Sequence, residues 1–459
     1  MTRHDPAPPT APRATASPPN ARSAGLRYGA LFGPVVFGVT AAGVALPDVA
    51  SALDSTPAAT AWVLTAHALA LGVGTALFGR LADARGVRTA LFLGSLALGV
   101  GALVCLLAPN LGVLVAGRFV QAAGSGGMAA CAMALTASVA PEQRPRVFAG
   151  FGATMAVFSA AATLAGGVLT AWVTWRLALV LPALSLLAAP LCLPGAPKND
   201  RSDTPKTAHR PMDLPGAALL TLTAMAFLVL IQSSALALSA SLVTATTLVL
   251  LLSTTALTWR VRTREASFVP RALVTDRVFL RAAVIGIGVY GGLFAAMYAV
   301  PQLLVRDHGW SVLSVGAWLL PGAVVGAVLS RLAGRLTGGE HGNRLLGAVA
   351  LAFAAALAVV PAGGGVVLPI LGASLGFAAF SVTQVFTTAL MAAHIEPARR
   401  GGAMGLLNLT FFVGGGIGSA TVGALAKSLP LSTALAIVAL FPLVAALVAF
   451  LPPRGRPEK

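Results

Sequence analysis

The sequence has few charged side chains, and acidic ones are the scarcest. Only 10% of its 459 residues are charged, with 14 Asp and Glu against 31 Lys and Arg, while 57% are hydrophobic and the mean hydropathy is +0.86. A soluble domain of this length carries roughly 25% charge. A soluble protein is therefore excluded. Apolar stretches long enough for a helix to cross a bilayer, about 20 residues, recur along the chain instead.

Cysteine frameworks and clustered acids are also missing. The three cysteines, Cys105, Cys131 and Cys192, lie inside apolar stretches, where a thiol behaves as a small hydrophobic group. The sequence has no P-loop, no carboxylate pair at catalytic spacing and no His or Cys group suited to a metal, so we expect no enzyme, no cofactor and no metal site. The net charge of +17 does not indicate nucleic-acid binding, because Arg and Lys stand in short groups between apolar stretches.

Fourteen apolar stretches are long enough to span a membrane. Six come first, two follow a polar stretch, and six more follow a second, basic connector. The predicted spans are 28–49, 60–79, 89–108, 111–137, 147–170, 174–193, 214–232, 239–258, 282–305, 310–333, 345–361, 365–389, 402–425 and 431–451. The fold class predicted is an all-α polytopic membrane protein with two pseudo-symmetric six-helix halves and a central helix pair.

The same pattern divides the chain into five parts. Residues 1–26 are rich in Pro, Ala, Thr and Ser and are expected to form a disordered cytoplasmic tail. The six-helix halves are 27–193 and 282–451, joined by a linker at 194–281 that contains the two extra helices, and 452–459 form a second cytoplasmic tail. The first apolar stretch is too long for the hydrophobic region of a signal peptide, so we expect it to remain as a span.

Positive charge predicts the orientation. If both termini are cytoplasmic, only Arg176, Arg306 and Lys427 fall outside, Arg118 lies within a span, and the rest of the 31 Lys and Arg are inside. Cytoplasmic loops are the positive ones in membrane proteins, and missing one span would exchange the two faces. We therefore expect a multi-pass protein of the bacterial cytoplasmic membrane, embedded in the lipid bilayer and functional as a monomer.

Two features recur in both six-span halves. GRLADARGVR (79–88) follows the second span, and GRLTGGEHGNR (334–344) follows the tenth. Small residues four positions apart, which let helices approach closely, mark the fifth and thirteenth spans. The positions expected to serve helix packing are Ser159, Thr163, Gly166, Gly167, Gly415, Ser419 and Gly423.

These motifs resemble those of the major facilitator superfamily, specifically its fourteen-span drug/proton antiporters, over nearly the whole chain after the tail. The loop residues Gly79, Leu81, Asp83, Gly86 and Arg88 follow the family's G-x-L-x-D-x-x-G-x-R pattern. RFVQAAGSG (118–126) is similar to its R-x-x-Q-G-x-G motif, VALP (44–47) to the end of its first-span motif, and Trp175-Arg176 to its Trp-Arg pair.

The resemblance implies a secondary transporter that exports hydrophobic drugs or secondary metabolites, with two halves rocking about a midplane cavity and protons as the driving ion. The chain departs from the family pattern at two places. Gly38 and Gly43 stand where the first span normally has an Asp and an Asn, and Ala162 and Thr163 replace a Gly-Pro in the fifth span. The residue that carries a proton is therefore open.

The family uses the loop after the second span as a conformational latch. The resemblance assigns this role to Gly79, Asp83, Gly86 and Arg88. A carboxylate in such a turn stabilises a neighbouring helix end, and an arginine can lock one state by pairing across the half. The alternative is a solvated charge pair worth under about 1 kcal/mol.

Four residues are candidates for coupling. Arg118 lies within the fourth span, where a charge is costly unless it has a partner or faces water, and Gln121 shares its face. His67 lies mid-way along the second span, and imidazole titrates near physiological pH. Asp48 is the nearest acid, at the outer end of the first span. The alternatives are a snorkelling arginine and a buried neutral histidine with one hydrogen bond.

A stripe on the ninth span is the candidate substrate surface. Tyr290, Phe294, Met297, Tyr298 and Gln302 recur at helical spacing and form an aromatic face with a polar end, which suits a hydrophobic small molecule. Gln384 and Asn408 on later spans are candidate orienting partners. Ordinary helix packing explains the same stripe. Two other functions stay open, a metabolite uptake or exchange carrier and a transport-inactive membrane sensor.

Overall fold

The computed structural model of the chain describes residues 21–140, 142–196, 213–233, 236–264, 267–336, 340–363, 365–395 and 400–451. Within these ranges every regular element is a helix. Residues 1–20 of the predicted tail 1–26, the predicted tail 452–459 and the polar stretch 197–212 lie outside the described residues.

The first six spans form the N-terminal half of the bundle. Its elements are α1 (Ala21–Phe32), η1 (Gly33–Val36), α2 (Phe37–Ala52), α3 (Pro57–Thr60), α4 (Trp62–Arg85), α5 (Val87–Leu107), α6 (Leu111–Ala137), α7 (Arg144–Trp172), α8 (Trp175–Val180), η2 (Leu181–Leu184), α9 (Ser185–Cys192) and η3 (Leu193–Gly195).

The central pair and the C-terminal half follow. The pair is α10 (Leu214–Ile231) and α11 (Ala240–Thr263), and the short α12 (Arg271–Val274) leads into the second half. That half consists of α13 (Arg277–Arg306), α14 (Val312–Leu336), α15 (Glu340–Ala358), η4 (Val360–Ala362), α16 (Val367–His394), α17 (Arg400–Leu425), α18 (Leu431–Val438) and α19 (Leu440–Phe450).

The predicted spans are confirmed. Thirteen helical stretches within the described residues are long and apolar enough to cross a membrane. The remaining predicted span corresponds to α14, a helix of 25 residues whose first part, Val312–Gly326, is itself apolar. Two six-helix halves with a central pair are therefore the fold of this chain.

Proline interrupts three of the spans, which the apolar pattern does not predict. Pro34 and Pro182 lie in the 3-10 turns η1 and η2, and Pro442 follows the break between α18 and α19. A proline ring has no N–H and clashes with the carbonyl four residues earlier, so the α-helix cannot continue unchanged. Each interruption leaves backbone groups free for other partners.

The first helix begins at Ala21, seven residues before the predicted span. Residues 21–26 are therefore helical, whereas the sequence pattern assigns them to the tail. The helix packs against α7 and α9, and Ala24 and Tyr28 are buried there. Because this contact is tertiary, local composition does not indicate it.

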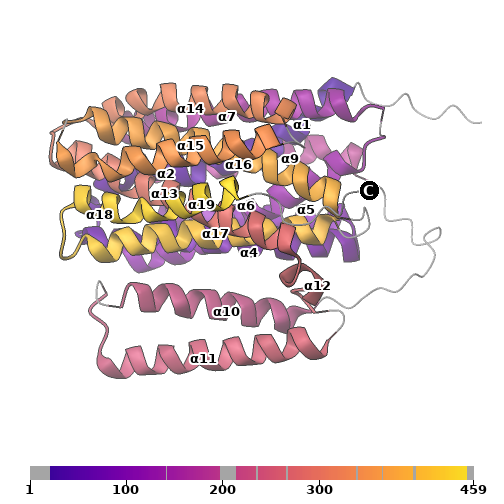
Figure 1. The fold of residues 1–459 in the computed structure, drawn as a ribbon, viewed down its shortest axis with the longest axis horizontal. Helices are drawn as coiled ribbons and strands as arrows, with labels where there is room; N and C mark the ends of the chain where they lie inside the picture. The colour runs from indigo at the N-terminus through magenta and orange to yellow at the C-terminus, as the bar shows by residue number, and fades with distance from the viewer. Residues whose placement is uncertain are drawn as a thin grey trace, which may run out of the picture.

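The two halves meet along three helix pairs, α2 with α13, α4 with α17 and α7 with α14. Figure 1 shows α10 and α11 side by side along one edge of the bundle. Most of α11 is exposed, as expected of a helix that faces lipid. We call the end of the bundle at which α1 begins and α19 ends the terminal face, and the other end the opposite face.

Candidate functional site

Arg118 lies at the centre of a buried polar cluster in the N-terminal half. Its side chain is fully buried on α6, and its Nη1 donates hydrogen bonds to Gln121 Oε1 and to the Leu179 carbonyl, both at 2.9 Å. Its Nη2 donates to the carbonyl oxygen of Gly38 on α2. A guanidinium with these acceptors holds three spans together, and Arg118 does not snorkel to the surface.

A helix break supplies one of these acceptors. Leu179 lies next to the junction of α8 with the turn η2, which contains Pro182. The Leu179 carbonyl accepts from Arg118 and, at 3.1 Å, from Gln121 Nε2. A carbonyl at the end of an α-helix has no intrahelical partner, so it is available to side chains. The sequence places Arg118 and Gln121 together correctly but contains no signal for this acceptor.

His67 lies against the same glycine. A Cβ atom added at Gly38 would be 2.2 Å from His67 Nε2, closer than any atom tolerates, so only glycine at 38 leaves room for the imidazole. His67 is fully buried, and neither ring nitrogen has a hydrogen-bond partner among the described residues. The alternative of a buried histidine with one hydrogen bond does not describe this ring.

The cluster retains further unmet hydrogen-bonding capacity. In the part of the chain that the structure describes, Arg118 Nε is buried without a partner, and so is Ser125 Oγ, about two turns further along α6. Such groups are rare in native proteins, and each indicates strain, an unseen water or ion, or a functional role. A water molecule or an acceptor group of a polar substrate would give the Arg118 Nε–H a partner.

Asp48 is not part of this cluster. It lies on α2 ten residues beyond Gly38, which is about 15 Å along a helix. Its side chain is partly exposed near the opposite face, next to the helical Pro47. The structure therefore separates the acid from Arg118 and brings His67 to it.

The loop between α4 and α5 contacts the end of the sixth span. Arg88 donates to the carbonyls of Ala196 at 3.1 and 3.2 Å and of Leu193 at 3.3 Å. The end of the sixth span thus supplies the acceptors of Arg88 in this conformation, and the role of Arg88 in a conformational latch stays a prediction. The side chain of Asp83 lies outside the described part of the structure.

The glycines of this loop differ in what they require. Gly86 connects the two helices with φ at +86° and donates its N–H to the Ala82 carbonyl. Gly79 lies on α4 with only the Ala130 side chain near the position of a Cβ, at 3.9 Å. The turn therefore depends on Gly86, and Gly79 contributes a loose contact with α6.

Arg80, which the sequence analysis does not single out, reaches the linker. Its Nη2 donates to the Phe268 carbonyl at 2.6 Å and lies 3.5 Å from the Ser267 carbonyl, and its guanidinium is 4.9 Å from the centre of the Phe268 ring. Asp213 binds the same residue through the Phe268 N–H at 2.8 Å and also bridges to Arg260 at 2.6 Å. The one available signal was the Gly-Arg-Leu repeated in both halves.

The stripe on α13 forms an aromatic cluster. The Tyr290 ring lies 4.9 Å from Phe380, 5.0 Å from Phe411 and 5.5 Å from Phe412, and 6.5 Å from Phe294. The Tyr290 hydroxyl donates to Gln384 Oε1 at 2.5 Å, so Gln384 contacts the stripe.

Asn408 lies on the same helix as two rings of this cluster. It is buried on α17, one turn before Phe411 and Phe412. Helical spacing of three and four from Asn408 could have identified both phenylalanines.

The other end of the stripe contacts the N-terminal half. A Cβ at Gly43 on α2 would lie 2.5 Å from the Met297 carbonyl, so the two helices touch there. Tyr298 and Gln302 are fully buried, and Gln302 Nε2 donates to the Tyr298 carbonyl at 3.2 Å. These side chains are packed in this conformation and do not line an open space.

The small residues of α7 and α17 lie at contacts between helices. On α7, Gly167 faces Val312 and Gly316 of α14, and Gly166 faces Ala41. The Thr163 carbonyl lies near Gly316, whereas Ser159 is only partly buried.

On α17 the three small residues face two different helices. Gly415 lies against Phe294 of α13, and Gly423 lies against Ala61. Ser419 Oγ lies 2.8 Å from Thr65 Oγ1 of α4. Gly423 and Ser419 therefore lie at the contact between the two halves, whereas Gly415 serves packing within the C-terminal half.

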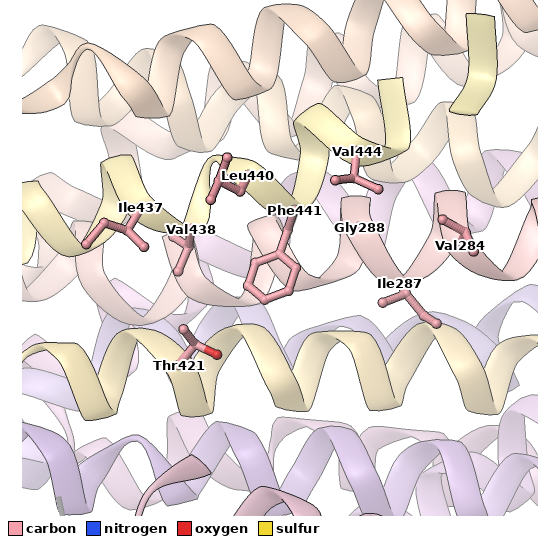
Figure 2. A pocket seen from close by; sticks show the side chains of 9 residues that line it. All are labelled: Val284, Ile287, Gly288, Thr421, Ile437, Val438, Leu440, Phe441 and Val444. Atoms are coloured by element: carbon pink, nitrogen blue, oxygen red, sulfur yellow. The ribbon is translucent and has the colours of Figure 1, made fainter. Parts of the chain in front are cut away.

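One pocket opens on the outer side of the C-terminal half. Figure 2 shows it between α13, α17 and the break that separates α18 from α19, with a volume of about 490 Å³. Its lining is Val284, Ile287, Gly288, Thr421, Ile437, Val438, Leu440, Phe441 and Val444. Thr421 is its only polar side chain, and the Thr421 hydroxyl donates to the Ile417 carbonyl. The pocket is therefore apolar and separate from the Arg118 cluster.

Comparison with known proteins identifies the family. The profile of the Major Facilitator Superfamily matches residues 30–388, most of the chain. This chain belongs to the major facilitator superfamily. A solved structure of the human organic anion transporter MFSD10 (TETRAN), which is 15% identical, superposes with a TM-score of 0.61 over 94% of this chain and all of that one, which shows the shared fold.

Several relatives of this superfamily member are named for transport or resistance. The uncharacterized transporter YebQ of Escherichia coli is 27% identical over 86% of this chain and 88% of its own length. The puromycin resistance protein of Streptomyces alboniger is 35% identical over 40% of this chain and 36% of its own length, and the lincomycin resistance protein of Streptomyces lincolnensis is 33% identical over 40% and 37%. The resemblance to the drug-efflux members is confirmed.

Proposed function

We propose that this transporter exports hydrophobic small molecules from a bacterial cell in exchange for protons, with His67 as the residue that carries the proton. The observation that supports it is that His67 lies beside Gly38, where glycine stands in place of an acidic residue. The family acid expected at this position is absent, and the imidazole of His67 fills its place beside Arg118. A titratable group thus stands at the expected location on a different helix.

The cluster suggests how a proton is loaded and released. The guanidinium of Arg118 stays charged in proteins and binds neutral carbonyl and amide oxygens here. Its fixed positive charge repels an imidazolium at His67 and assists release of the proton. When the cluster is open to the proton-rich side, water gives His67 a partner and stabilises the charged ring.

The substrate surface is the aromatic cluster on α13, α16 and α17. The rings of Tyr290, Phe380, Phe411 and Phe412 offer apolar faces, and the Tyr290–Gln384 pair offers a donor and an acceptor. A few polar groups within an aromatic surface are typical of sites for hydrophobic molecules. Because the rings are packed here, binding requires the two halves to separate.

Alternating access explains the packing between the halves. At the opposite face Gly423 lies against Ala61, and Gly167 lies against the start of α14. These contacts close this face in the described conformation. We propose that the terminal face is cytoplasmic, because Arg80, Arg88 and other basic residues gather there and cytoplasmic loops carry such charge.

The test is transport by purified protein in proteoliposomes with an imposed pH gradient. Radiolabelled puromycin and lincomycin are the first probes, because two relatives are named for resistance to them. His67→Gln should abolish accumulation driven by the gradient and preserve downhill exchange of the same probe. His341→Gln is the matched control, since that histidine is exposed at the start of α15.

Three outcomes contradict parts of the proposal. Gradient-driven accumulation by His67→Gln at the parent's rate would exclude His67 and direct attention to Asp48. A parent that exchanges probe but ignores the gradient would be an exchange carrier. A parent that moves no probe under either condition would favour the transport-inactive sensor.

A further inference from the structure

The extra helix α10 packs across the seam between the two halves. It contacts α4 of the N-terminal half and α17 of the C-terminal half. Leu228 is fully buried there, among Leu69 of α4 and Ala420 of α17, and its side chain lies 3.3 Å from the position of a Cβ at Gly416. Because α10 contacts both helices, its contacts change when α4 and α17 separate.

A chain of polar side chains joins the three helices near the opposite face. Gln232, at the C-terminal end of α10, donates from Nε2 to Thr65 Oγ1 at 3.4 Å. Thr65 Oγ1 lies 2.8 Å from Ser419 Oγ on α17. All three side chains are completely buried. These two hydrogen-bonding contacts connect the central pair with α4 and α17 near the opposite face.

The hydrogen bonds of Gln232 are incomplete. Its Oε1 is buried and accepts no hydrogen bond from any described residue. A buried amide oxygen without a donor costs free energy, because it has lost its hydrogen bonds to water and has formed no other hydrogen bond. Opening the seam would hydrate this oxygen and recover that cost.

The terminal end of the central pair is held to α4. Arg80 of α4 binds the Phe268 carbonyl, and Asp213 at the start of α10 accepts from the Phe268 N–H and from Arg260 of α11. The α10–α11 pair is thus attached to the N-terminal half at both ends. Separation of the halves at the opposite face therefore moves α17 away from α4 and α10 together.

We propose that Gln232 is a positioning residue of the transport cycle, which raises the free energy of the closed seam between α4 and α17 so that the opposite face can open. The inference rests on the alternating access of the proposed function. It requires neither His67 nor a particular substrate. Thr65 has the reverse effect, since its bond to Ser419 exists only while the seam is closed.

Two substitutions should therefore shift the equilibrium in opposite directions. Gln232→Leu keeps an apolar side chain of similar size and removes the unpaired oxygen, so the open population should fall on the order of tenfold. Thr65→Val keeps the shape and removes the bond across the seam, so the open population should rise severalfold. Ser419 retains its contacts with the Gly415 and Gly416 carbonyls in that variant.

The measurement is the distance distribution between spin labels at Ser51→Cys and Ser428→Cys, by pulsed electron paramagnetic resonance in lipid nanodiscs. Both serines are exposed at the opposite face, one on each half, and the three native cysteines are buried. Thr223→Val is the matched control, because among the described residues Thr223 on α10 bonds to Ser253 of α11 and to its own helix, and not to the seam. It should leave the distribution unchanged.

A purely structural role predicts that Gln232→Leu lowers the melting temperature, whereas this proposal predicts an equal or higher one with fewer open molecules. If Gln232→Leu fails to fold, Gln232→Met provides the same test. A parent with long and short distances and a Gln232→Leu protein with the same distribution would overturn this inference alone. A parent with only short distances at every pH and with every probe would overturn the proposed alternating access as well.

Discussion

At the scale of single residues, the most informative pair is Gly38 with His67. Glycine at 38 has no side chain, and the histidine ring from the neighbouring helix occupies the space that a side chain would take. Arg118 touches the same glycine through its carbonyl. A titratable group of α4 therefore lies beside the glycine whose carbonyl Arg118 binds.

The contact between Gly38 and His67 predicts what happens when an acidic residue is placed at position 38. Gly38→Asp alone should reduce gradient-driven transport at least about tenfold, because its Cβ would lie 2.2 Å from His67 Nε2 and the ring must move. Gly38→Asp combined with His67→Ala should recover most of the activity, since a carboxylate can then pair with Arg118. Transport in proteoliposomes is the measurement, with His67→Ala as the control. A double variant as inactive as Gly38→Asp would show that His67 does more than fill this place.

At the scale of elements, the connection between α4 and α5 is a single residue. Gly86 has φ +86° and ψ 153°, a region that residues with a Cβ rarely enter. It lets α5 begin at Val87 directly after α4 ends at Arg85. Arg88 is thereby placed beside the carbonyls at the end of the sixth span.

Gly86→Ala should therefore destabilise the protein by about 1–3 kcal/mol. The apparent melting temperature in detergent measures this effect. Gly152→Ala is the matched control, because that glycine lies within α7 with nothing within 4 Å of a Cβ and alanine favours a helix. Equal melting temperatures for Gly86→Ala and the parent would mean that the turn relaxes without strain.

The central pair depends on Asp213 at the terminal face. Partial burial raises the pKa of Asp213, but the hydrogen bonds from Arg260 and from the N–H groups of Phe268 and Gly216 outweigh it and hold the pKa below its ordinary value of 3.8. A carboxyl with a lowered pKa stabilises the fold above its ordinary pKa. That contribution disappears as the pH falls through the lowered value.

Asp213→Asn should accordingly lower the melting temperature at neutral pH, because Asn keeps an acceptor for the helix end but loses the charge that binds Arg260. The difference from the parent should be the same at about pH 7 and pH 5 and should shrink below about pH 3.8. Thermal unfolding at each pH measures it. A difference that is independent of pH down to about pH 3 would assign the stabilisation to hydrogen bonding alone.

At the scale of the whole molecule, the apolar pattern was sufficient to predict the spans and their grouping, because a bilayer imposes one length on every crossing helix. The apolar pattern was insufficient where packing against another helix determines the local structure. The helical start at Ala21 depends on packing against α7, and the break at Pro182 matters because it releases the Leu179 carbonyl. Division of the chain into the five proposed parts stays a prediction.

The candidate site was partly visible in the same way. Arg118 and Gln121 share one helix face, so spacing alone brought them together. The meeting of His67 with Gly38, and of Arg80 with Phe268, joins different helices and requires the folded bundle. The motif did not identify the partners of Arg88, because a motif names a residue and does not state which backbone carbonyls lie beside it.

The orientation of the whole bundle yields the final prediction. Ser51 and Ser428 lie at the opposite face, after the first and the thirteenth spans, and Thr263 ends α11 at the terminal face. All three are exposed, so a cysteine at each should react with a thiol reagent that does not cross membranes. In intact cells the cysteines at 51 and 428 should be labelled, and the cysteine at 263 only after permeabilisation, because the proposed orientation puts the basic terminal face in the cytoplasm. The parent is the control, since its cysteines are buried.

Labelling of 51 and 428 from different sides would require an odd number of crossings between them and remove the fourteen-span topology. Labelling of 263 alone in intact cells would retain the topology and invert the orientation.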